Sequence, residues 1–164
     1  MKYILFIFIL CITNFFVSAE EKCEFPNSVE DLLSLRKYEK MDTDSVYYYL
    51  RQYQDDRGNY RFFKLYEGVF NNTPILIYMM QNSDIHIIYG CLNPYTERYP
   101  STLLLWRQNS NGITDWFKIK DGIIYTYKLF RIWDLYYIAE QSFKIANSIF
   151  THLSSKETGV LAAD

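Results

Sequence analysis

Between residues 45 and 130 the chain alternates apolar and polar positions with a period of about two, which is typical of half-buried β-strands. β-Branched and aromatic residues, which strands favour, dominate this part of the chain. Short polar segments separate the apolar runs, so we expect neighbouring strands to be antiparallel. The strongest turn signal is Asp121-Gly122, a two-residue hairpin turn. The predicted strands cover residues 45–54, 59–70, 74–81, 85–92, 102–108, 116–120 and 123–130.

Two segments that flank these strands have helical spacing instead. Residues 28–41 are predicted to form a short helix. Asn27 or Ser28 is its cap candidate, and Glu30 and Asp31 lie in its first turn. Residues 132–153 place apolar side chains on one stripe, which predicts a long helix that docks against the sheet. Residues 154–164 have no periodicity, and we expect a mobile tail there.

These elements predict a mainly β domain, with α+β as a possible class. It would contain an antiparallel sheet of about seven strands, a short N-terminal helix and a long C-terminal helix. The sheet is expected to form a barrel or to be strongly curved. In the curved alternative the sheet grips the long helix, which fills the space that a barrel ligand would occupy. Because no linker or repeat interrupts the pattern, residues 20–153 are expected to form one domain.

The first 19 residues have the features of a secretory signal peptide. Lys2 precedes an apolar run that ends in Val17-Ser18-Ala19, the small-x-small pattern that signal peptidase recognises. We therefore expect a secreted, extracellular protein that begins at Glu20 and has no membrane contact after cleavage. A retained signal anchor that spans a bilayer is the minor alternative.

In a secreted protein two cysteines can form a disulfide, and an Asn-x-Thr triplet can be glycosylated. Cys23 and Cys91 remain after cleavage, and in an oxidising compartment they most simply form one disulfide, worth about 4 kcal/mol by chain entropy. Two free buried thiols are the alternative. Asn71-Asn72-Thr73 makes Asn71 a candidate glycosylation site, although the following Pro74 can lower its use.

Composition and motifs argue against several functional classes. Cleavage leaves 16 basic and 19 acidic side chains, a net charge near −3, so we expect no nucleic-acid-binding surface. The two histidines, His86 and His152, are not spaced for a metal site, and no phosphate-binding glycine loop or nucleophile elbow occurs. We therefore expect neither an enzyme nor a bound metal or cofactor.

Aromatic side chains are abundant, with 16 Tyr, 12 Phe and 3 Trp. Strand propensity, core packing and an A+T-rich gene explain part of this content. In a closed barrel, inward-facing aromatic residues could also line a cavity for an apolar ligand. Exposed tyrosines could instead form a surface for a protein partner.

Residues 74–111 resemble the lipocalins, the calycin family. In both, a strand, a polar turn (here Asn82-Ser83-Asp84), a strand rich in Ile and Tyr, a polar loop and an apolar strand closed by Arg (here 103–107) follow in this order. Several arthropod lipocalins also pair a cysteine near the mature N-terminus with one in the penultimate barrel strand, which Cys23 and Cys91 would match. The resemblance, which also covers the predicted C-terminal helix, is to a divergent or shortened member of the family.

The resemblance implies a secreted, non-enzymatic carrier that holds a small apolar or amphipathic ligand in a β-barrel cavity. If a three-residue loop at 82–84 joins its strands, Tyr78 pairs with Ile88 and Met80 with His86, and these side chains face inward while Cys91 faces outward. A one-residue error in this loop would reverse the assignment of the first strand. The candidate ligand-binding residues are Tyr78, Met80, His86, Ile88, Leu104 and Trp106, for each of which core packing is an equal explanation. The alternative function is a secreted effector or inhibitor that binds a protein partner through a Tyr-rich surface.

Overall fold

The protein folds as one antiparallel sheet of nine strands arranged in chain order. The structure is a computed structural model and describes residues 25–35, 38–42, 60–94, 100–133 and 135–162. The predicted signal peptide, Cys23 and the predicted strand at 45–54 lie outside these residues. The elements are α2 (Val29–Ser34), β1 (Glu39–Lys40), β2 (Arg61–Phe70), β3 (Thr73–Gln81), β4 (His86–Leu92), β5 (Thr102–Asn109), β6 (Gly112–Lys120), β7 (Ile123–Ile132), β8 (Leu135–Ala146) and β9 (Ile149–Ala162).

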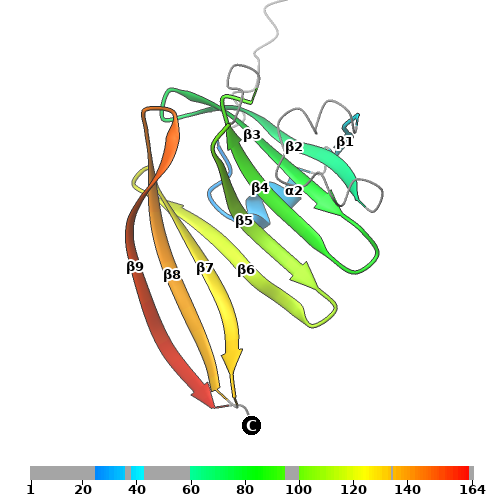
Figure 1. The fold of residues 1–164 in the computed structure, drawn as a ribbon. Helices are drawn as coiled ribbons and strands as arrows, with labels where there is room; N and C mark the ends of the chain where they lie inside the picture. The colour runs from blue at the N-terminus through cyan, green and yellow to red at the C-terminus, as the bar shows by residue number, and fades with distance from the viewer. Residues whose placement is uncertain (1–24, 36–37, 43–59, 95–99, 134, 163–164) are drawn as a thin grey trace, which may run out of the picture.

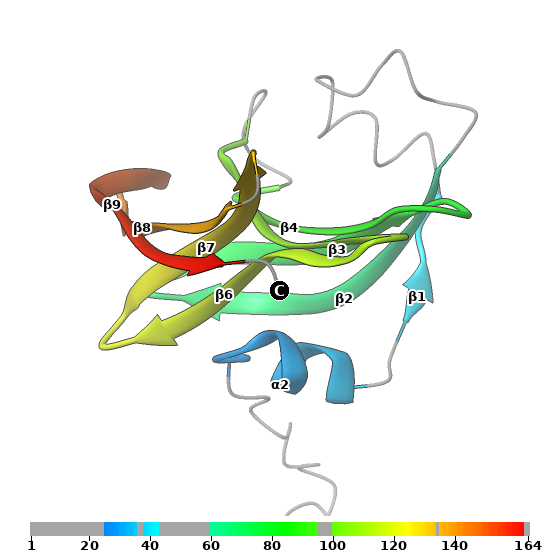
Figure 2. The ribbon, with the colours of Figure 1, turned by 90° about the horizontal axis from the view of Figure 1, so that it is seen from below.

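The sheet is strongly curved but open, with β1 at one edge and β9 at the other (Figures 1 and 2). The start of β9 approaches the start of β5, where the Phe150 amide donates a hydrogen bond of 3.1 Å to the Ser101 hydroxyl. No strand ladder connects the two edges in the described part of the chain, so the barrel alternative is wrong. The curved-sheet alternative described the sheet better, although the helix it was to hold is not there.

The short helix α2 closes one face of the sheet beneath β2 and β6 (Figure 2). Ser28, one of the two predicted cap candidates, caps it, since its hydroxyl accepts a hydrogen bond of 3.1 Å from the Asp31 amide. The segment before the helix is held by the sheet, because the Ile119 amide donates to the Asn27 carbonyl at 2.9 Å. The helix is shorter than predicted, and β1 follows within the range 28–41.

Strands β3 and β4 are buried on both faces, so their alternate residues enter two separate hydrophobic clusters, to which β2 also contributes. The first cluster packs α2 against the sheet, and the second lies on the opposite face of the same strands. The first contains the buried residues Val29, Leu32, Leu65, Tyr66, Phe70, Ile75, Ile77, Met79, Ile88, Leu92, Leu105, Trp106, Phe117 and Ile124. The second contains Phe62, Leu76, Tyr78, Met80, Ile87, Tyr89 and Cys91.

Three of the hairpins turn through two residues with positive φ, the backbone that suits the twist of β-hairpins. These pairs are Asn71-Asn72, Asp121-Gly122 and Asn147-Ser148. The Asp121-Gly122 turn, with φ values of 53° and 73°, confirms the hairpin predicted there. The first two turns are joined, because the Asn71 side-chain amide donates to the Gly122 carbonyl at 3.1 Å.

The predicted long C-terminal helix is wrong, because residues 135–162 form the hairpin of β8 and β9. The apolar residues of 132–153 fit a helical stripe, but aromatic and β-branched side chains make up much of the segment and favour strands. Asn147-Ser148 supplies a two-residue turn within it. Pairing of β8 with β7 over nine residue pairs then stabilises the strand beyond any local helical preference. Residues 154–162, where a mobile tail was expected, belong to β9.

Candidate functional site

The six predicted ligand-binding residues do not share one cavity. Tyr78 and Met80 lie in the second cluster, against which Leu104 packs, whereas Ile88 and Trp106 lie in the first. His86, at the start of β4, pairs with Gln81 and Gln108 and is partly buried. Both sets contact neighbouring core side chains, so in this sheet they contribute to packing.

One extra residue in the β3–β4 loop separates Tyr78 and Met80 from Ile88, and a register shift between β4 and β5 separates Leu104 from Trp106. The loop contains four residues, 82–85, closed by a hydrogen bond of 3.0 Å from the Asn82 amide to the Ile85 carbonyl. Tyr78 therefore pairs with Tyr89, with ring centroids 5.6 Å apart, and Met80 pairs with Ile87. This shift by one residue moves Tyr78 and Met80 to the face opposite Ile88.

Cys91 is a fully buried free thiol within the described residues. Burial among the apolar side chains of the second cluster raises its pKa to about 12, because the thiolate would lose its hydration there. The side chain predicted to face outward thus lies in a core. Since Cys23 is outside the described residues, the Cys23–Cys91 disulfide stays a prediction. Glycosylation of Asn71, which is exposed in the β2–β3 turn, stays a prediction as well.

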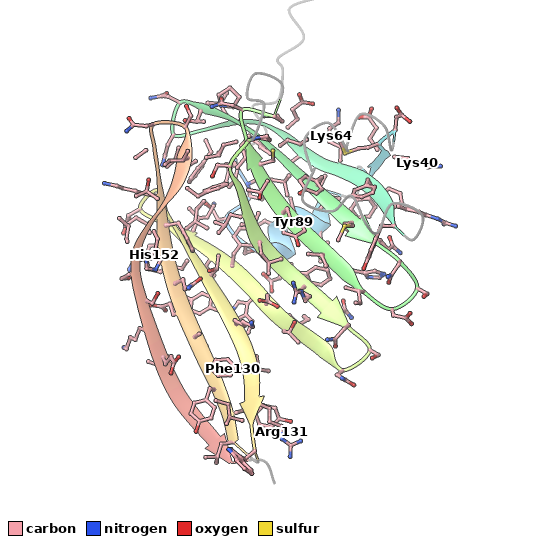
Figure 3. All side chains as sticks on the ribbon, viewed as in Figure 1. Lys40, Lys64, Tyr89, Phe130, Arg131 and His152 are labelled. Carbon is pink, nitrogen blue, oxygen red and sulfur yellow. The ribbon has the colours of Figure 1, made fainter. Side chains whose placement is uncertain are left out.

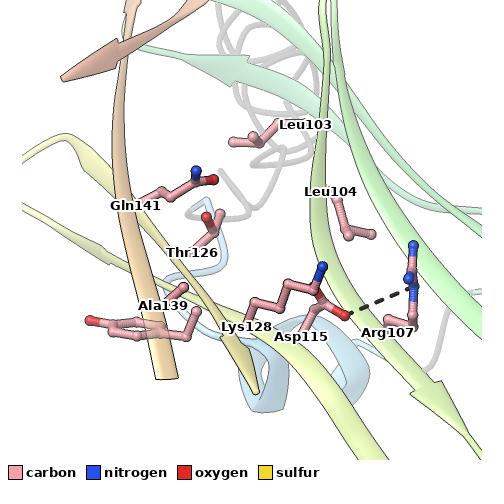
Figure 4. Close-up of a pocket in the computed structure, with 9 residues that line it drawn as sticks. Leu103, Leu104, Arg107, Asp115, Thr126, Lys128, Ala139 and Gln141 are labelled. Carbon is pink, nitrogen blue, oxygen red and sulfur yellow. Dashed lines mark ion pairs between the residues drawn. The ribbon is translucent and has the colours of Figure 1, made fainter. Parts of the chain in front are cut away.

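A cleft of about 290 Å³ lies on the curved sheet where β5, β6, β7 and β8 meet (Figure 4). Charged and polar side chains supply much of its wall, unlike the apolar cavity that a carrier was expected to have. The residues that line it are Leu103, Leu104, Arg107, Asp115, Thr126, Tyr127, Lys128, Ala139 and Gln141. Burial and the nearby Glu140 carboxylate raise the pKa of Tyr127.

The hairpin tip, defined as residues 130–133 and 135–137, carries apolar and aromatic side chains at the far end of β7 and β8. Phe130 and Arg131 mark its place at that end (Figure 3). Trp133 is 89% exposed, and its neighbours Ile132 and Leu135 are 45% and 37% exposed. No other side chain among the exposed large hydrophobic residues of the described part is as exposed as Trp133.

Contacts within the hairpin tip give it a defined shape. Phe130 and Tyr137 face each other across β7 and β8 and stack with centroids 5.6 Å apart. The Arg131 guanidinium lies over the Tyr136 ring, 5.7 Å from its centroid, and its Nε donates to the Trp133 carbonyl at 2.8 Å. The tip therefore presents a supported turn with Trp133 at its end.

Strand β9 gives the same region a long open edge. It pairs with β8 from Ile149 to Ala162 and is the last strand of the sheet. An edge strand has unpaired amide and carbonyl groups that can pair with another extended chain. Ile149 and Leu153 are exposed on it. We call β7, β8 and β9 the C-terminal arm.

The sequence reasoning predicted β7 but missed β8 and β9 of the C-terminal arm, because it assigned residues 132–153 to a helix. Two signals could have found them: the Asn147-Ser148 turn, and the aromatic residues that continue on both sides of Trp133. Neither signal alone shows that Trp133 is exposed, since that depends on where the hairpin ends relative to the core.

The described residues contain neither a cluster of metal ligands nor a membrane-spanning helix. No three His, Cys, Asp or Glu side chains gather there in a way that could hold a metal ion. The same residues include no helix that is long and apolar enough to cross a membrane.

Comparison with known proteins places the chain in no established family. No family model, curated protein or solved structure matches it. The resemblance to lipocalins therefore stays a prediction from the sequence.

Proposed function

We propose that this chain is a secreted interaction protein that binds a protein partner through its C-terminal arm, with Trp133 as the anchor. The observation that carries the proposal is the exposure of Trp133, 89%, beside two other exposed apolar side chains. Exposure of an indole to water is unfavourable, so a partner that buried Trp133 would gain free energy of binding.

The composition of the hairpin tip supports a protein partner. Tryptophan, tyrosine and arginine are the residues most enriched at binding hot spots, and the tip offers Trp133, Arg131, Tyr136 and Tyr137. The Phe130–Tyr137 stack and the contacts of Arg131 with the Tyr136 ring and the Trp133 carbonyl support the tip before binding, which lowers the entropy lost on association. The partner expected is a folded protein with an apolar pocket that accepts the indole.

The open edge of β9 supplies a second means of contact. An extended segment of the partner could add to the sheet there by main-chain hydrogen bonds, which is a recurring mode of recognition. The edge strand carries His152, Lys156 and Glu157 as exposed polar groups, which limits indiscriminate pairing. In this arrangement the tip provides affinity and the edge provides orientation.

A carrier of an apolar ligand fits this geometry less well. That hypothesis used a barrel cavity, whereas the sheet is open and the cleft on it is lined by Arg107, Asp115 and Lys128. Native mass spectrometry of the protein isolated from its source separates the two functions. An apolar molecule that co-purifies stoichiometrically would favour the carrier.

Photo-crosslinking followed by affinity measurement tests the partner proposal. The full secreted chain, with a benzophenone amino acid in place of Trp133 or, as a control, of Val69, is exposed to its native extracellular fluid. Any protein captured specifically at position 133 is then purified, and its affinity for the unmodified chain is measured. Trp133→Ser is expected to weaken binding by about 30-fold, the size of a hot-spot loss of about 2 kcal/mol.

Ile113→Ser is the matched control, because Ile113 is also exposed but lies beside the β5–β6 turn. It is expected to leave the affinity within about twofold. Equal affinity of the Trp133→Ser variant and the unmodified chain would overturn the proposal. So would binding of the chain to phospholipid vesicles, but to no protein, through Trp133.

A further inference from the structure

We infer that the cleft between β5 and β8 is a binding site for a small organic carboxylate, separate from the hairpin tip that carries the proposed protein-binding anchor. Three charged side chains from three adjacent strands stand in one row across it. Arg107 of β5 pairs with Asp115 of β6, which in turn pairs with Lys128 of β7. All three line the cleft (Figure 4).

Asp115 lies in the middle of this row and is buried. The residue is 7% exposed, and its Oδ2 accepts a hydrogen bond of 2.8 Å from the Thr114 hydroxyl. A buried carboxylate needs compensating positive charge, and Arg107 and Lys128 stand on its two sides. With two cations against one carboxylate, the row retains a net positive charge towards the cleft.

Arg107 has a donor that the described protein atoms leave unused. Its Nε is buried and makes no hydrogen bond, since the nearest acceptor of its ion pair, Asp115 Oδ2, is 3.9 Å away. That distance is beyond hydrogen-bond range. The Nε itself has almost no accessible surface, but the Arg107 side chain is 38% exposed and lines the cleft, where its guanidinium can bind an acceptor and matches a planar carboxylate particularly well.

Lys128 can act on the same ligand because no carboxylate other than Asp115 adjoins it in the row. The next acidic residue along the row is Glu157, which pairs with Ala139 and stands two strands from Lys128. Strand spacing puts their backbones about 10 Å apart. A cationic ligand would be repelled by both Arg107 and Lys128.

The other residues of the cleft wall indicate the size and polarity of the rest of the ligand. Leu103, Leu104 and Ala139 provide apolar surface, while Thr126 and Gln141 provide neutral polar groups. The volume of about 290 Å³ is at the lower limit of about 300–1,000 Å³ for drug-sized ligands. The site thus fits a carboxylate on a single ring or a short branched chain.

Fluorine NMR of the full chain tests this site with 4-fluorobenzoate as the probe and 4-fluorobenzamide as its neutral isostere. Saturable binding of the benzoate below about 5 mM, a reasonable affinity for so small a ligand, is expected, with much weaker binding of the benzamide. Lys128→Gln is expected to raise the dissociation constant about tenfold, as loss of a charged contact does. Arg107→Gln should abolish saturation.

Lys120→Gln is the matched control, because it removes the same charge from an exposed lysine at the β6–β7 turn. It is expected to leave the dissociation constant unchanged. Since Lys128 is itself exposed, its variant should fold even if Arg107→Gln does not. Absence of saturation with the benzoate, equal binding of the benzamide, or equal effects of the Lys128 and Lys120 variants would each overturn the inference.

Discussion

The strands β2 to β4 and the C-terminal arm belong to one sheet but differ in how deeply their side chains are buried. In β3 only Pro74 and Gln81 are not buried, whereas in β8 only Ser142 is buried. Both faces of β3 lie in hydrophobic clusters, while the arm extends beyond them (Figure 1). Stability is therefore concentrated in the first region, which leaves the second free to present side chains to a ligand or partner.

The same substitution in the two regions should show the largest difference in stability. Ile77→Ala removes a fully buried side chain from β3 and is expected to lower the free energy of unfolding by about 2–5 kcal/mol. Ile138→Ala in β8, where the side chain is partly buried, should lower it by about 1 kcal/mol. Urea unfolding measures both. Equal losses would mean that the arm is as firmly packed as the core.

Alkaline pH should lower the free energy of unfolding through ionisation of Cys91, if that thiol is reduced. Its pKa is raised to about 12, above the ordinary value of 9.0. Between these values the unfolded state releases the proton and the folded state keeps it, so stability falls as pH rises. The expected loss is about 1.4 kcal/mol per pH unit above pH 9.

Urea unfolding of the reduced protein between pH 8 and pH 10 measures this loss, with Cys91→Ala as the variant that lacks the Cys91 contribution. An equal slope in the two proteins would contradict the assignment to Cys91. Thiol labelling of the unfolded, unreduced protein shows separately whether Cys91 is free, because a disulfide with Cys23 would block the reaction.

The hydrogen bond between two turns should couple β2–β3 to β6–β7. Asn71→Asp keeps the size of the side chain but replaces the amide that donates to the Gly122 carbonyl with an acceptor. The free energy of unfolding is expected to fall by about 1 kcal/mol. Asn72→Asp is the control in the same turn, and it should change stability less. If both variants lose the same stability, the turn backbone and not the hydrogen bond is responsible.

The smallest effect on stability is expected at the hairpin tip. Trp133→Ser removes an exposed side chain and should change the free energy of unfolding by less than about 0.5 kcal/mol. Combined with a large loss of partner affinity, this result would assign Trp133 to binding alone. A loss of several kcal/mol in thermal or urea unfolding would show that the indole supports the arm instead.

Local signals predicted much of the first region but little of the second. Strands β2 to β7 and the Asp121-Gly122 turn were recognisable because alternation and turn chemistry agree there. In residues 132–153 the two signals disagreed: the apolar spacing fitted a helix and the residue types fitted strands. Only pairing with β7, which is not visible in the local pattern, resolved the conflict.

The candidate sites were harder to predict than the strands. Tyr78, Met80 and Ile88 were grouped on the assumption of a three-residue loop, and the four-residue loop separated them. The row of Arg107, Asp115 and Lys128 comes from three different strands, and its alignment depends on an irregular register between β5 and β6. No spacing within one segment of the sequence indicates that alignment.

By itself the sequence determined that the chain forms antiparallel strands, where many of them turn, and that a short capped helix precedes them. These properties depend on backbone conformation and on contacts between near neighbours in the chain. The tertiary structure alone decided that the sheet stays open, that its last three strands form an arm, and which side chains meet. Those outcomes depend on register and curvature summed over nine strands, where one extra loop residue or bulge reverses the face of a side chain.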